Sequence, residues 1–93
     1  MNFENKVVWI TGASSGIGEA LALQLSEKGA QLILSSRRVD ALEEVKAKCK
    51  NLNQIHVEPL DLTQIDSFEN ITKSIVDKFG RIDVLINNGG ISQ

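Results

Sequence analysis

The 93-residue chain contains no tyrosine, one cysteine and one proline. A single cysteine, Cys49, can form neither an internal disulfide nor a metal site of several thiolates, so a disulfide-stabilised secreted scaffold is excluded and a cytoplasmic location is expected. No apolar run approaches the ~18 residues that span a bilayer, so no membrane partner is expected. Twelve acidic residues outnumber ten basic ones, and nothing therefore favours a nucleic-acid partner.

Four short apolar runs alternate with three segments in which apolar residues recur at helical spacing. The predicted strands lie at 7–10, 32–34, 55–57 and 82–86, and the predicted helical stripes at 17–25, 42–49 and 68–79. Trp9 and Cys49 fall on apolar positions, so both are expected in the core. The alternation predicts an α/β fold, a Rossmann-type doubly wound parallel sheet with four strands and three helices. We expect residues 1–93 to be the N-terminal part of a single domain that continues beyond residue 93, because the fourth strand would otherwise be an exposed apolar edge.

A glycine-rich turn joins the first predicted strand to the first predicted helix. It consists of Gly12, Ala13, Ser14, Ser15, Gly16, Ile17 and Gly18. We expect Gly12 to make a tight turn, Gly16 to let a ligand approach the backbone, and Gly18 to let the helix pack closely. The helix start presents unpaired N–H groups that suit a pyrophosphate, to which the serines add hydroxyl donors. A purely structural turn is the alternative. A nucleotide-hydrolysing P-loop is excluded because Glu19 follows Gly18 where that loop needs lysine.

The spacing Gly-x-x-x-Gly-x-Gly resembles the TGxxxGxG motif of the short-chain dehydrogenase/reductase family, which residues 11–18 match at each fixed position. The resemblance covers the whole chain, because Asp61 follows the third predicted strand and Asn-Asn-Gly-Gly at 87–90 stands where the family carries NNAG. Trp9 and the Ser-Arg-Arg segment at 36–38 are similar to the member-seven branch of that family. The resemblance implies a homo-oligomeric enzyme that transfers hydride between a nicotinamide and a small-molecule alcohol or carbonyl substrate.

Ser36, Arg37 and Arg38 follow the second predicted strand, where NAD-specific sheets carry an acid that binds the adenosine ribose. A hydroxyl and two guanidinium groups suit a 2′-phosphate instead, so NADP (NADPH) is the predicted cofactor and NAD is less favoured. By resemblance to the family, Arg37 is the better phosphate ligand of the two arginines. The alternative is that both are solvated surface residues. They precede a predicted helix start, however, where the helix dipole disfavours cations unless an anion lies nearby.

The resemblance assigns three further residues to the cofactor. The Asp61 side chain would accept a hydrogen bond from the adenine amino group, with the Leu62 backbone alongside, and Asn88 would line the ribose. Two alternatives stay open: Asp61 is also a stabilising carboxylate at a helix start, and the Asn88 amide can bond to neighbouring strands.

Residues for the chemical step are absent from this sequence. In the family the acid is a tyrosine, assisted by a lysine four positions later and by a serine. Because the chain has no tyrosine, no catalytic residue is assigned, and we expect residues 1–93 alone to bind NADPH weakly without turnover. No metal site is predicted, since His56 has no second ligand in view. Two other functions stay open: a non-catalytic nucleotide-binding or sensor module, and a methyltransferase, which the two arginines disfavour.

Overall fold

The computed structural model describes residues 2–14, 16–60 and 65–88, without the side chains of 65–67. Strands and helices alternate along the chain, as the spacing of apolar residues predicts. The elements are β1 (Val7–Thr11), α1 (Gly16–Glu27), β2 (Gln31–Ser35), α2 (Val39–Lys48), the 3-10 turn Leu52–Gln54, β3 (Ile55–Val57), α3 (Ile65–Phe79) and β4 (Val84–Asn87). The short 3-10 turn has no counterpart among the predicted elements.

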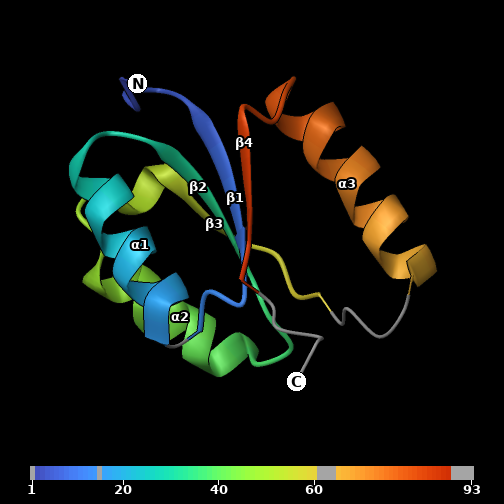
Figure 1. The fold of residues 1–93 in the computed structure, drawn as a ribbon, viewed down its shortest axis with the longest axis horizontal. Helices are drawn as coiled ribbons and strands as arrows, with labels where there is room; N and C mark the ends of the chain where they lie inside the picture. The colour runs from blue at the N-terminus through green and yellow to red at the C-terminus, as the bar shows by residue number, and fades with distance from the viewer. Residues whose placement is uncertain (1, 15, 61–64, 89–93) are drawn as a thin grey trace.

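The four strands form one parallel sheet in the order β3-β2-β1-β4. Helices α1 and α2 cover one face of the sheet and α3 covers the other, which makes three layers (Figure 1). The predicted fold class, a Rossmann-type doubly wound α/β sheet with four strands and three helices, is therefore confirmed. The two inner strands are the most apolar, because strands with helices on both faces need apolar side chains on both. All five residues of β1 are buried.

The larger part of the core lies between the sheet and the α1–α2 layer. Strand residues Val8 and Ile10 pack there against Leu25 of α1 and Leu42 of α2. The stripe predicted for the second helix is confirmed, since Leu42, Val45 and Cys49 are all buried. Helix α2 also starts three residues before that stripe, at Val39, which places the basic segment 36–38 directly before its first turn.

The stripe predicted for the first helix is wrong at its first position. Ile17 leaves 70% of its surface exposed, whereas Ala22 and Leu25 of the same helix are buried. The physical reason is that α1 buries the face formed by Gly18, Ala22, Leu25 and Ser26, and Ile17 lies one residue before this face. Ile17 therefore belongs to the surface around the glycine turn and not to the core.

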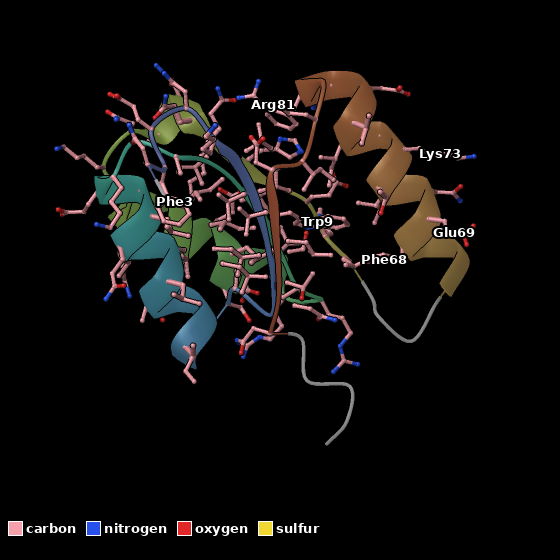
Figure 2. The ribbon with its side chains drawn as sticks, turned by 45° about the horizontal axis from the view of Figure 1, so that its top comes forward. Phe3, Trp9, Phe68, Glu69, Lys73 and Arg81 are labelled. Atoms are coloured by element: carbon pink, nitrogen blue, oxygen red, sulfur yellow. The ribbon has the colours of Figure 1, made fainter. Side chains whose placement is uncertain are left out.

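The smaller part of the core lies between the sheet and α3. Trp9, Ile33 and Ile75 are buried there, and the ring of Phe68 stacks on the Trp9 indole with centroids 5.2 Å apart (Figure 2). The apolar stripe predicted for the third helix is confirmed. Strand β4 lies at the edge of the sheet and alternates half-buried with exposed positions, with Leu85 46% exposed.

Candidate functional site

The carboxyl ends of β1 and β2 lie side by side and carry both segments that the sequence singles out. Thr11, the last residue of β1, is in register with Ser35, the last residue of β2. The glycine turn leaves β1 from this point and leads into α1, and the basic segment leaves β2 and leads into α2 (Figure 1). Ligands of open α/β sheets bind beyond these ends of the strands, so the fold brings the two predicted parts of a site together.

Gly12 makes the tight turn that the sequence predicts. Its φ angle is +66°, in the left-handed region that suits glycine. The N–H of the following residue, Ala13, donates a hydrogen bond of 3.1 Å to the carbonyl oxygen of Ser35, and the Ala13 side chain is fully buried. The glycine turn is thus tied by its backbone to the end of β2.

Gly16 and Gly18 differ in what surrounds them. Gly16 is exposed, with a φ of +62°, and a Cβ atom added to it would have no atom within 4 Å. Gly18 is buried, and an added Cβ would overlap the Gly12 carbonyl oxygen and lie 2.9 Å from the Asn88 amide nitrogen. Gly18 therefore allows close packing, as predicted, and Gly16 leaves the start of the helix open to solvent.

Asn88 connects the end of β4 to the glycine turn. Its Nδ2 donates to the Gly12 carbonyl oxygen at 3.3 Å, and its backbone N–H donates to the Thr11 carbonyl oxygen, also at 3.3 Å. Next to it, the Thr11 hydroxyl donates to Oδ1 of Asn87 at 2.8 Å. The strand-bridging alternative left open for Asn88 is thus present. An amide nitrogen carries two N–H bonds, and the contact with Gly12 uses one of them.

Ser36, Arg37 and Arg38 form a turn that carries two exposed cationic side chains. The Ser36 hydroxyl oxygen accepts a hydrogen bond of 3.1 Å from the Arg38 N–H, and the Ser36 carbonyl oxygen accepts one of 3.0 Å from Leu60. Both arginines are exposed, and neither forms an ion pair with any residue that the structure describes. They lie at the start of α2, where Arg38 is the N-cap residue and the helix dipole opposes positive charge.

Three of the predicted site residues, Ser15, Asp61 and Leu62, lie outside the described residues. Of the others, Ser14 is half-buried in the glycine turn, and Ile17 exposes its side chain at the first turn of α1. The predicted site residues that the structure describes all gather at one end of the sheet.

The sequence interpretation missed Ser35. This residue is fully buried, its carbonyl oxygen holds the glycine turn, and its hydroxyl accepts a hydrogen bond of 2.8 Å from Nε1 of Trp9. A signal was available, because a tryptophan N–H that is buried needs an acceptor and Ser35 is the first hydroxyl after an apolar strand. What the sequence could not indicate is that the two side chains meet on one face of the sheet.

The described parts of the chain contain no group of three or more potential metal ligands. His56, the candidate with no second ligand, instead contacts the Glu58 carboxylate at 3.0 Å and packs edge-on against the ring of Phe79. No helix within the described ranges is long and apolar enough to cross a membrane.

The sheet order, the glycine turn at the end of β1 and the crossovers through α1 and α2 define a Rossmann-type α/β protein. The family model of the short chain dehydrogenases matches residues 6–93, and the chain belongs to that family. The resemblance of the TGxxxGxG and NNGG segments to this family is thereby confirmed.

Individual relatives agree with the family. The chain is 59% identical over 92 residues to human dehydrogenase/reductase SDR family member 7, covering 94% of this chain and 27% of that protein. The mouse protein of the same name is 56% identical over 92 residues, again covering 94% of this chain and 27% of its own length. Among solved structures, a short chain dehydrogenase from Bacillus anthracis superposes with a TM-score of 0.86 at 38% identity, over 92% of this chain and 35% of that one. The similarity to the member-seven branch is confirmed, and the chain spans about a quarter to a third of the length of these proteins.

Proposed function

We propose that this chain is the cofactor-binding part of an NADP(H)-dependent short-chain oxidoreductase, which transfers hydride between the nicotinamide and an alcohol or carbonyl group. The main support for the proposal is that an open glycine turn and two exposed arginines, which have no ionic partner among the described residues, lie at the same end of a parallel sheet. The glycine turn alone would suit any dinucleotide. The arginines add the preference for the phosphorylated form.

The diphosphate is proposed to lie against the start of α1. The first turn of a helix has N–H groups without intrahelical partners and carries about half a positive charge. Because no described atom outside the adjacent residues and the helix backbone lies within 4 Å of the Gly16 Cβ position, an anion can approach these N–H groups closely enough to accept hydrogen bonds. Ser14 borders the same turn and supplies a hydroxyl.

The 2′-phosphate is proposed to lie between Ser36 and Arg37. The Ser36 oxygen already accepts the Arg38 N–H at 3.1 Å, while the acceptor of its own proton among the described residues, the Arg38 carbonyl oxygen, is 3.5 Å away. Such a hydroxyl is suited to donate to a phosphate oxygen, which only accepts. No carboxylate occurs at positions 35–38 to repel the phosphate or to bind the ribose hydroxyls of NAD.

When bound, the nicotinamide cofactor supplies the hydride acceptor or donor. The residues of this chain bind and orient it: the glycine turn holds the diphosphate, and Asn88 fixes the Gly12 carbonyl while keeping one N–H for a ligand. No proton donor is assigned here because the chain has no tyrosine. The whole protein is proposed to be a homo-oligomer in the cytoplasm, with Asp61 and Leu62 at the adenine.

The cofactor preference is tested by titrating the protein with NADPH and NADH while following the fluorescence of Trp9, the only tryptophan in the chain. We expect NADPH to bind more tightly. Replacing Arg37→Ala removes a charge-assisted hydrogen bond, which is worth roughly 1.5–3 kcal/mol, so NADPH affinity should fall about 10- to 100-fold. NADH affinity should change little.

Lys73→Ala is the matched control, because Lys73 is an exposed cation on the outer side of α3 (Figure 2). This variant loses the same charge and should keep the NADPH affinity. Tighter binding of NADH than of NADPH by the unchanged protein would refute the proposed cofactor. Steady oxidation of NADPH with a carbonyl substrate by purified residues 1–93 would refute the claim that this part only binds.

A further inference from the structure

Trp9 and Ser35 form a buried side-chain pair that the proposed contacts with the cofactor do not use. Trp9 is 1% exposed, Ser35 is fully buried, and the indole N–H donates to the serine hydroxyl oxygen at 2.8 Å. Both side chains lie on the α3 side of the sheet. Trp9 is paired in register with Ile33, two residues before Ser35, so the indole leans diagonally across β2 toward the carboxyl end of the strands.

Ser35 is the residue from which both halves of the candidate site are held. Its carbonyl oxygen accepts the Ala13 N–H of the glycine turn at 3.1 Å. The next residue, Ser36, begins the basic turn, and its carbonyl oxygen is held by the Leu60 N–H at 3.0 Å. A displacement of Ser35 would therefore change the position of Ser36 and Arg37 relative to the glycine turn.

The indole is itself held firmly on its other side. The Phe68 ring of α3 stacks on it at a centroid distance of 5.2 Å and an interplanar angle of 13° (Figure 2). In this stacked orientation the Trp9 N–H points at Ser35. A smaller apolar residue would fill part of the same space but would leave the buried Ser35 hydroxyl without this donor.

We propose that Trp9 is a positioning residue for the 2′-phosphate end of the cofactor site, acting through its hydrogen bond to Ser35. The inference rests on the proposed function, because it concerns the same site. The pair holds the last residue of β2 in place, and with it the turn that carries Ser36 and Arg37. At this turn NADH carries only a neutral ribose hydroxyl where NADPH carries the 2′-phosphate, so loosening the turn weakens the binding of NADPH much more than that of NADH.

The test is the ratio of the NADPH and NADH dissociation constants, measured calorimetrically on the intact protein and its variants. Trp9→Phe keeps an aromatic ring against Phe68 and removes the donor, and Ser35→Ala removes the acceptor. Each variant should reduce the preference for NADPH about 3- to 10-fold, the effect of one hydrogen bond. The double variant should lose no more than either single one, because both changes break the same bond.

Ile75→Val is the matched control. Ile75 is 2% exposed in the same core between the sheet and α3. This variant should lower the melting temperature about as much as Trp9→Phe or Ser35→Ala does. It should leave the ratio of the NADPH and NADH dissociation constants unchanged. If Trp9→Phe and Ser35→Ala lower the melting temperature but keep the ratio of the unchanged protein, the pair is purely structural and the inference is wrong.

The two proposals fail in different ways. If the unchanged protein shows no preference for NADPH, the proposed cofactor is wrong and the inference falls with it. If the unchanged protein prefers NADPH and Arg37→Ala removes the preference, while the Trp9 and Ser35 variants keep it, only the positioning role is wrong. A variant that does not fold is replaced by Ser35→Cys, whose weak sulfur acceptor should give an intermediate loss of the ratio; an unchanged ratio in that variant would also overturn the inference.

Discussion

The two ends of the sheet use polar groups in opposite ways. At the amino end, one oxygen of the Asp83 carboxylate accepts hydrogen bonds from the Val7 N–H and from Nε of Arg81, each at 2.8 Å. Arg81 also reaches the Asn5 carbonyl oxygen at 3.2 Å, and the Asp83 N–H bonds to the Val7 carbonyl oxygen at 2.9 Å. The start of β1 is thus closed by side chains and backbone of the same chain.

At the carboxyl end, the described residues do not close the starts of α1 and α2 in this way. Gly16 has free space at its Cβ position, and Arg37 and Arg38 have no ionic partner among the described residues. Charged groups that are paired within the chain stabilise the fold, whereas exposed charges and N–H groups without an internal partner are available to a ligand. The described residues thus close the amino end of the sheet with internal contacts and leave the starts of α1 and α2 at the carboxyl end accessible, a difference that substitutions at each end can test.

The largest effect is expected from Gly18→Ala. The added methyl group would overlap the backbone carbonyl of Gly12, which cannot move without displacing the turn. We expect a loss of roughly 1–3 kcal/mol in the free energy of unfolding, as in other overpacked sites, together with loss of cofactor binding. Thermal unfolding and NADPH titration would measure both. Stability equal to that of the unchanged protein would contradict the packing described here.

The effect of Gly16→Ala on cofactor binding can be distinguished from its effect on stability by comparison with Gly80→Ala, the matched control. Both glycines have a left-handed backbone, with φ of +62° and +84°, and neither has an atom within 4 Å of its Cβ position. Each substitution should therefore cost roughly 1–2 kcal/mol of backbone strain. Only Gly16→Ala should also weaken NADPH binding, because its methyl group enters the open space at the start of α1. If Gly16→Ala and Gly80→Ala changed NADPH affinity equally, the proposed difference between the two ends of the sheet would be wrong.

Asp83→Asn should act on stability alone. The hydrogen bond from Val7, and next that from Arg81, hold the pKa of Asp83 below its ordinary value of 3.8. A carboxylate whose pKa is lower in the folded state stabilises the fold above the unfolded pKa, and this contribution is lost as the pH falls through the folded pKa. The variant should therefore unfold at a lower temperature than the unchanged protein at neutral pH, and the difference should shrink below about pH 4.

The exposed Asp77 of α3 supplies the control for this experiment, as Asp77→Asn. It changes the net charge equally and should leave the melting temperature nearly unchanged. Neither variant should alter the ratio of NADPH to NADH affinity. A changed ratio in Asp83→Asn would show that the amino end also influences the site.

A smaller effect is expected at Cys49, which belongs to neither end. Burial raises the pKa of its thiol, and the hydrogen bond with Ser26 opposes this only in part. Because the thiolate is the reactive form, a thiol reagent should modify Cys49 slowly in the native protein and rapidly in denaturant. NADPH should not change the native rate. Fast modification of the native protein would contradict the burial of this side chain.

The smallest effect is expected from the ion pair between Lys48 of α2 and Glu19 of α1, whose nitrogen and oxygen are 2.9 Å apart. The hydrogen bond to Glu19 raises the pKa of Lys48 above its ordinary value of 10.5, so any stabilisation is present below that pH and is lost above it. The lysine side chain is 59% exposed, and water and salt weaken such pairs. Lys48→Met should hardly change the melting temperature at neutral pH, and added salt should remove any difference.

Much of the fold could be predicted because its signals are local. The unbroken apolar run from Val7 to Ile10 is typical of a strand covered on both faces, and the stripe of Leu42, Val45 and Cys49 follows the 3.6-residue period of a helix that packs on a sheet. The spacing of apolar residues in a helix does not say which of them face the sheet, and in α1 the buried face runs through Gly18, Ala22 and Leu25. This is why Ile17 fits the helical stripe in sequence and yet is exposed in the structure.

Residues close together in the chain are enough to indicate the alternation of strands and helices, the glycine turn after the first strand and the basic turn after the second. The pairs of side chains and backbone groups that meet in the fold are far apart in the chain: Trp9 and Ser35 are separated by 26 residues, and Asp83 and Val7, like Asn88 and Gly12, by 76. These contacts depend on the order β3-β2-β1-β4 and on the register of the strands, which local spacing does not contain.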